Sequence, residues 1–78
     1  MEQKIANKIM SDLNSLDGYE VKKYLYCGTW VIEINEMEKR KHCILIPARV
    51  IEACYKNYKC PTIQNIGNGE EYQRIIIM

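Results

Sequence analysis

Residues 19–47 read YEVKKYLYCGTWVIEINEMEKRKHCILIP, and this stretch decides the fold. Two runs in it, Tyr19–Cys27 and Trp30–Asn35, alternate between two sets of side chains, and a third run, His42–Ile46, follows a charged turn. Alternation with period two, rich in aromatic and β-branched residues, predicts β-strands. Because the connections are short and polar, we expect a three-stranded antiparallel meander over residues 19–46.

The alternation assigns side chains to the two faces of this sheet. One face of the first strand carries Glu20, Lys22, Tyr24 and Tyr26, and the other carries Tyr19, Val21, Leu25 and Cys27. In the second strand Trp30, Ile32 and Ile34 share one face, whereas Val31, Glu33 and Asn35 share the other. We therefore expect a tyrosine pair to be displayed between charges on the outer face.

Apolar residues recur at helical spacing on both sides of the strands. The first such segment, residues 1–17, is expected to be an amphipathic helix that Gly18 ends in a left-handed conformation. The second, residues 47–59, begins at Pro47 and has to close before Pro61. The fold class is therefore α+β: a single small domain in the order α-β-β-β-α, with both helices on one face of the sheet.

Residues 60–78 are expected to form a loop and a terminal strand. Thr62–Ile66 and Tyr72–Met78 flank a Gly67-Asn68-Gly69 turn and could form a hairpin. In the terminal run, Ile76 points away from Ile75 and Ile77. We expect this strand to join the sheet of its own chain, and the alternative is a strand-exchanged homodimer.

Composition limits the functions that the chain can have. The 78 residues form one domain with little room for an internal cavity. Eleven basic and ten acidic residues give a net charge of +1, which favours neither a strong nucleic-acid surface nor a polyanionic mimic. Neither a signal peptide nor a membrane span is recognisable, so we expect an intracellular, cytoplasmic protein without membrane contact.

No cofactor, metal or catalytic site is expected. The four cysteines (Cys27, Cys43, Cys54, Cys60) lack the spacing of a zinc site, and we expect ordinary buried, reduced thiols. A cysteine nucleophile would need a histidine base, and the sole histidine, His42, lies in or beside a lysine-rich turn. Glycine patterns that bind phosphate are missing as well. We therefore expect a protein that is not an enzyme.

The order of the first five expected elements is similar to that of double-stranded-RNA-binding domains. Those domains carry a lysine cluster at the start of the second helix, where residues 47–51 offer only Arg49. The resemblance is one of architecture, and it implies no transfer of RNA-contacting residues to this chain.

The leading functional hypothesis is a protein-binding module: an inhibitor, adaptor or regulator of a larger complex. Many Tyr, one Trp and the missing catalytic residues favour it, because Tyr, Trp and Arg dominate interfaces. The bias toward Ile, Lys, Asn, Glu and Tyr resembles coding from AT-rich DNA, so a phage or bacterial accessory protein that inhibits a host or defence system is a natural subclass. The candidate partner-binding residues are Lys22, Tyr24, Tyr26, Lys39, Arg40 and Lys41. The alternative is a nucleic-acid-binding domain that adds Lys23 to the same residues.

Overall fold

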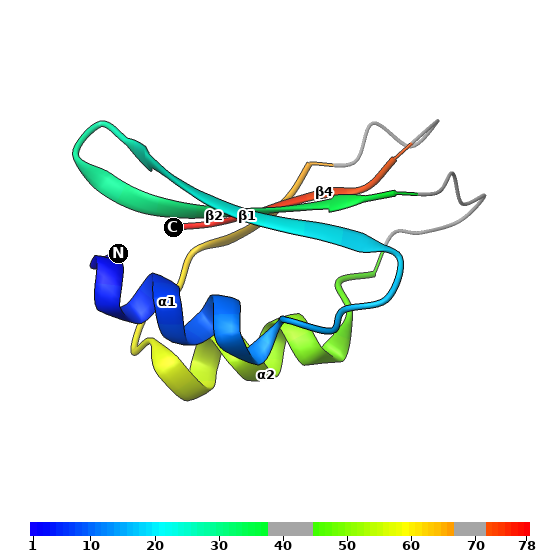
Figure 1. Ribbon diagram of the computed structural model, residues 1–78, viewed down its shortest axis with the longest axis horizontal. Helices are drawn as coiled ribbons and strands as arrows, with labels where there is room; N and C mark the ends of the chain where they lie inside the picture. Colours follow the sequence, from blue (N-terminus) through cyan, green and yellow to red (C-terminus); the bar gives the residue numbers. More distant parts are fainter. Residues whose placement is uncertain (38–44, 67–71) are drawn as a thin grey trace.

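The computed structural model describes residues 1–37, 45–66 and 72–78. Its elements are α1 (Gln3–Asp12), β1 (Tyr19–Tyr26), β2 (Thr29–Glu36), α2 (Ala48–Asn57), β3 (Ile63–Asn65) and β4 (Arg74–Ile77). The strands form one antiparallel sheet in the order β1-β2-β4-β3. Both helices lie on the same side of this sheet (Figure 1). The expected α+β class, with two helices packed on one face of an antiparallel sheet, is therefore confirmed.

A two-residue turn joins β1 to β2 and sets the register of the whole hairpin. Tyr26 pairs with Thr29, so only Cys27 and Gly28 lie between the strands. Both have positive φ angles, 53° and 81°, which is the geometry of the tight turns that match the twist of a hairpin. Gly28 adopts this conformation at no steric cost, whereas a side chain at Cys27 rarely does.

The C-terminal strand β4 occupies the centre of the sheet, between β2 and β3. Ile75 pairs with Ile34 and Ile77 pairs with Ile32, and all four side chains are fully buried. Ile76 points to the opposite face and is half-buried, as its alternation predicts. The pairing of β3 with β4 is also as expected, and β4 joins the sheet of its own chain, whereas the expected turn at residues 67–69 lies outside the described part of the chain.

The prediction of a third meander strand over His42–Ile46 is wrong where the structure tests it. Leu45 and Ile46 belong to no strand and lead directly into α2, and residues 42–44 lie outside the described part of the chain. The position beside β2 belongs to β4 instead. Two isoleucines on one face of β4 complete the core between β2 and β3, whereas Leu45 is 78% exposed.

The core lies between the helices and the inner face of the sheet. Ala6, Ile9 and Leu13 come from α1 and the residue after it, and Val50, Ala53 and Cys54 come from α2. They pack with the isoleucines of β2 and β4, and complete burial of each such side chain stabilises the fold by about 1.5–3 kcal/mol. The core thus fixes which side of every strand faces the helices.

Both helices are shorter than expected, and side chains from α2 hold the end of α1. The helix predicted over residues 1–17 ends at Asp12, and Gly18, with φ 81°, instead precedes β1. The Arg49 guanidinium donates to the carbonyls of Asp12 and Ser15, both at 2.9 Å. Such contacts satisfy carbonyls that a helix end leaves without partners.

A buried polar joint holds one end of the sheet together. Backbone N–H of Glu36 donates to the Gln73 carbonyl at 2.9 Å, and backbone N–H of Gln73 donates to Glu36 Oε1 at 2.9 Å. The Tyr19 hydroxyl donates to Gln73 Oε1 at 3.0 Å, and Gln73 Nε2 donates to the Leu45 carbonyl at 3.0 Å. These bonds connect the start of β1, the end of β2, the start of β4 and the segment before α2.

Candidate functional site: the open face of the sheet

One face of the sheet is packed against the helices, and no described element covers the other face (Figure 1). We call the latter the open face. The alternation and the strand register place on it Glu20, Lys22, Tyr24 and Tyr26 of β1, Val31, Glu33 and Asn35 of β2, Arg74 and Ile76 of β4, and Gln64 of β3. The sequence-based assignment of Tyr24 and Tyr26 to the outer face is therefore confirmed.

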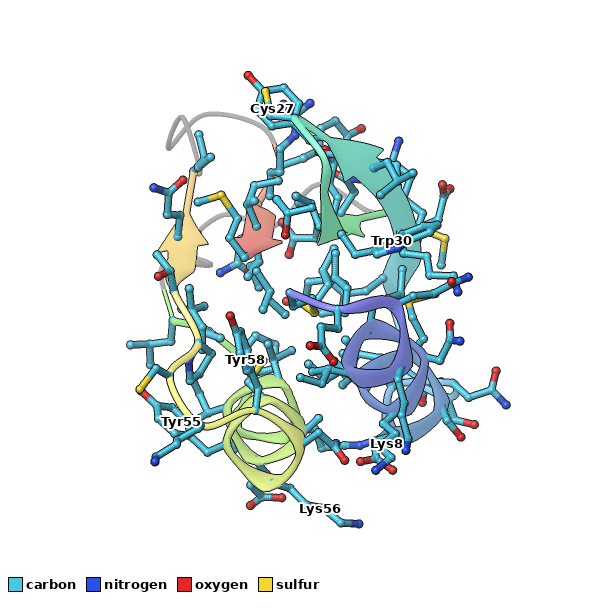
Figure 2. All side chains as sticks on the ribbon, turned by 90° about the vertical axis from the view of Figure 1, so that its left-hand side faces the viewer. Lys8, Cys27, Trp30, Tyr55, Lys56 and Tyr58 are labelled. Atoms are coloured by element: carbon cyan, nitrogen blue, oxygen red, sulfur yellow. The ribbon has the colours of Figure 1, made fainter. Side chains whose placement is uncertain are left out.

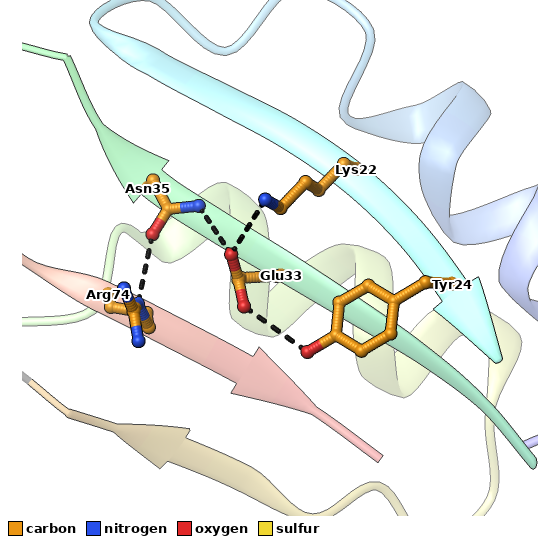
Figure 3. A network of polar contacts seen from close by, with 5 residues as sticks. All are labelled: Lys22, Tyr24, Glu33, Asn35 and Arg74. Atoms are coloured by element: carbon orange, nitrogen blue, oxygen red, sulfur yellow. Dashed lines mark hydrogen bonds and ion pairs between the residues drawn. The ribbon is translucent and has the colours of Figure 1, made fainter. Parts of the chain in front are cut away.

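Glu33 is the centre of a polar network on the open face (Figure 3). Its Oε1 accepts a hydrogen bond from the Tyr24 hydroxyl at 3.2 Å. Its Oε2 accepts one from Asn35 Nδ2 at 2.8 Å and forms an ion pair with Lys22 Nζ at 3.2 Å. Arg74 Nε in turn donates to Asn35 Oδ1 at 3.2 Å. Side chains of β1, β2 and β4 are thus connected across the sheet.

This network favours one protonation state for each of its acidic groups. The hydrogen bond from Asn35 lowers the pKa of the Glu33 carboxyl, with Lys22 and Tyr24 acting in the same direction. Burial, followed by the hydrogen bond to Glu33, raises the pKa of the Tyr24 hydroxyl. At neutral pH the carboxylate is therefore charged and the tyrosine is a hydrogen-bond donor, so the two groups are held in complementary roles.

The open face divides into a polar part and an apolar part along the strands. Glu20, Asn35 and Arg74 form one row across the sheet, and Lys22, Glu33 and Ile76 form the next. Tyr24 and Val31 form the row after that, toward the β1–β2 turn. Val31 is only 2% exposed, yet it does not belong to the cluster beneath the helices. Its neighbours on the open face therefore cover it.

The structure brings some of the predicted binding residues together and separates others. Lys22, Tyr24 and Tyr26 share the open face, and Tyr26 is 62% exposed. Lys23 lies on the opposite face, where Nζ donates to Asn7 Oδ1 of α1 and lies 5.1 Å from the centroid of the Trp30 ring. The alternative that groups Lys23 with Tyr24 and Tyr26 therefore needs correction, because alternation places Lys23 on the helix side. The predicted binding residues Lys39, Arg40 and Lys41 lie outside the described part of the chain.

Sequence reasoning missed Glu33, Asn35 and Arg74 as members of the site. Alternation along β2 does place Glu33 and Asn35 on the outer face. In the sequence, however, nothing distinguishes Glu33 from an ordinary solvent-exposed glutamate. The informative signal is the two-residue turn at Cys27-Gly28, because it places Glu33 directly opposite Lys22. No sequence signal indicated Arg74, because the residues of the C-terminal strand do not show which strand it pairs with.

Among the described residues, three cysteines and a hollow between the helices lie outside the open face. Cys54 is buried as expected, but Cys27 and Cys60 are exposed, so the expectation of buried thiols is wrong for those two. Within residues 1–37, 45–66 and 72–78 no group of three His, Cys, Asp or Glu could hold a metal ion. A hollow of about 220 Å³ beside Asp12, Arg49 and Lys56 is lined by side chains that connect α1 to α2. None of the helices in the described ranges is long and apolar enough to cross a membrane.

Comparisons with protein-family models, with curated proteins and with solved structures found no match to this chain. The open face is therefore interpreted from its own chemistry.

Proposed function

We propose that the chain is a small protein-binding module that is not an enzyme, and that it acts as an inhibitor, adaptor or regulator through the open face. The observation that carries this proposal is the open face itself, because Tyr24, Tyr26 and Arg74 all belong to this one face, which no described element covers. Tyrosine and arginine are enriched among residues that dominate binding energy at protein interfaces.

The polar network supports the proposal because it holds the face in a defined conformation before any partner binds. The side chains of Lys22, Tyr24, Asn35 and Arg74 are each fixed by at least one contact within the network. Ordering a long side chain on binding costs about 0.5–1.5 kcal/mol, and contacts that exist in the free protein reduce this cost. A partner therefore meets a largely preformed surface.

The charges of the open face favour a protein over nucleic acid. Two basic residues, Lys22 and Arg74, are balanced there by two acidic ones, Glu20 and Glu33. Lys22 is moreover paired with Glu33 at 3.2 Å. Non-specific binding to nucleic acid depends on several unpaired cations that neutralise phosphates. Lys23, which might have added a cation, is directed to the helix side.

A matched pair of tyrosines tests which surface binds. Tyr26 on the open face and Tyr55 on α2 are each 62% exposed, and Figure 2 shows Tyr55 on the helix layer. We expect Tyr26→Ala to remove a partner that the wild-type chain captures from nuclease-treated lysate, and Tyr55→Ala to leave capture unchanged. Equal loss in both variants, or loss for Tyr55→Ala alone, would contradict the proposal.

Salt dependence separates this function from nucleic-acid binding. We expect only weak binding to RNA or DNA, at or above roughly micromolar at physiological salt, as for a non-specific contact. Affinity in the nanomolar range that falls steeply as salt rises, measured by fluorescence anisotropy, would instead assign the chain to the nucleic-acid-binding class.

A further inference from the structure

We infer that the open face binds a polypeptide segment of the partner that presents a carboxylate to Arg74 and an apolar side chain to the ring of Tyr24, beside which Val31 is already buried. This inference rests on the proposed function and specifies the chemistry of its partner. It follows from the way in which the network uses each polar atom of the open face.

Both oxygens of the Glu33 carboxylate already have donors from their own chain. Its Oε1 accepts from Tyr24, and its Oε2 accepts from Asn35 and pairs with Lys22. A basic partner residue would therefore compete with Lys22 for an anion that is neutralised and hydrogen-bonded. Glu33 organises the surface, and it is a poor anchor for an incoming cation.

Arg74 is in the opposite situation. Its Nε is fixed by Asn35 Oδ1 at 3.2 Å, and its two terminal nitrogens have no partner among the described residues. No carboxylate of residues 1–37, 45–66 and 72–78 lies within ion-pair distance of this exposed guanidinium. A guanidinium presents parallel N–H groups that match a carboxylate in bidentate geometry, and one fixed in advance loses less entropy on binding.

The charge of Glu20 limits where this carboxylate can lie. Glu20 occupies the same row as Arg74, with Asn35 between them, so roughly two strand spacings, about 9.6 Å, separate their backbones. A carboxylate over β4 therefore gains the attraction of Arg74 and stays far from Glu20.

The apolar part of the site lies at a defined distance along the strands. Val31 and Asn35 are four residues apart on β2, which corresponds to about 13 Å. An extended partner segment spans this distance with residues i and i+4, and a helical one spans about 10.5–12 Å with residues i and i+7 or i+8. Tyr24 on β1 and Ile76 on β4, the two strands beside β2, flank the position that the apolar side chain would occupy.

A displayed library of random 12-residue peptides, selected on the immobilised 78-residue chain, tests the inference. We expect enriched peptides to carry Asp or Glu together with an aliphatic or aromatic residue four, seven or eight positions away. Arg74→Gln should weaken these peptides about tenfold or more, as expected for loss of a charge-assisted hydrogen bond. Arg74→Lys should restore part of the affinity, because it keeps the charge but loses the bidentate geometry.

Lys8→Gln is the matched control, since it removes an exposed charge from α1 on the other side of the molecule (Figure 2). It should leave peptide affinity unchanged. Circular dichroism should show that this variant and the Arg74→Gln, Arg74→Lys and Tyr24→Ala variants are all folded. Peptides without acidic residues that lose binding on Tyr24→Ala but not on Arg74→Gln would overturn this inference and leave the proposed function standing. A lack of enriched peptides, or binding insensitive to both Tyr24→Ala and Arg74→Gln, would overturn both.

Discussion

Two neighbouring isoleucines of β4 give the sharpest test of the sheet. Ile75 is fully buried against the helices, whereas Ile76 is half-buried on the open face. Truncation of a buried isoleucine to alanine costs about 2–5 kcal/mol through lost burial and the cavity that remains. We expect Ile75→Ala to cost that much and Ile76→Ala to cost about 1 kcal/mol, because less of its surface is buried.

Urea denaturation followed by far-UV circular dichroism and by Trp30 fluorescence measures both costs. A domain of 78 residues has a total stability of about 4–12 kcal/mol, so Ile75→Ala could unfold it. Ile75→Val then provides a milder step, with an expected loss of about 0.5–1.5 kcal/mol. If Ile76→Ala destabilised the protein as much as Ile75→Ala, Ile76 would be buried in solution and the open face would not be uncovered.

Three further predictions address the network and the thiols. Tyr24→Ala and Tyr26→Ala should each weaken partner binding by about 1 kcal/mol or more without unfolding the chain, as checked by calorimetry and circular dichroism; unfolding would place these rings in the core. NMR titration should show a pKa of Glu33 below its ordinary value, and Asn35→Ala should raise this pKa. Because the pKa is lowered in the folded state, the stabilisation from Glu33 is fully present above the unfolded-state pKa. It is lost as the pH falls through the folded-state pKa. Burial raises the pKa of the Cys54 thiol to about 11, so iodoacetamide labelling read by mass spectrometry should modify Cys27 and Cys60 at neutral pH well before Cys54, and equal rates would contradict its burial.

The sequence predicts most local structure because the decisive signals are local. The period-two pattern of β1 and β2, the helical stripes of α1 and α2, and the opposite orientation of Ile76 all follow from spacing alone. Assignment of Tyr24 and Tyr26 to the outer face follows in the same way, since every second residue of a strand shares a side.

The order of the strands is not local, and this is where prediction from sequence failed. Leu45 and Ile46 have the composition of a strand, as do the isoleucines of β4, and both segments could have lain beside β2. Burial decides which of the two segments lies beside β2, because β4 places two fully buried side chains in the core. The contact between Arg74 and Asn35 depends on that outcome, so no local pattern could have predicted the complete network.

The edges of the sheet offer a partner less than the open face does. β3 has three residues, which is too short to template an added strand securely. β1 has eight residues, but Lys22 and Lys23 lie in its middle on opposite faces, and charges in such positions discourage pairing between edges. Lys23 is additionally held by Asn7 and stacked on Trp30, so an incoming strand could not displace it without breaking contacts to α1. With both edges protected in this way, the face that carries Tyr24, Glu33 and Arg74 is the surface on which a partner can gain the most from binding.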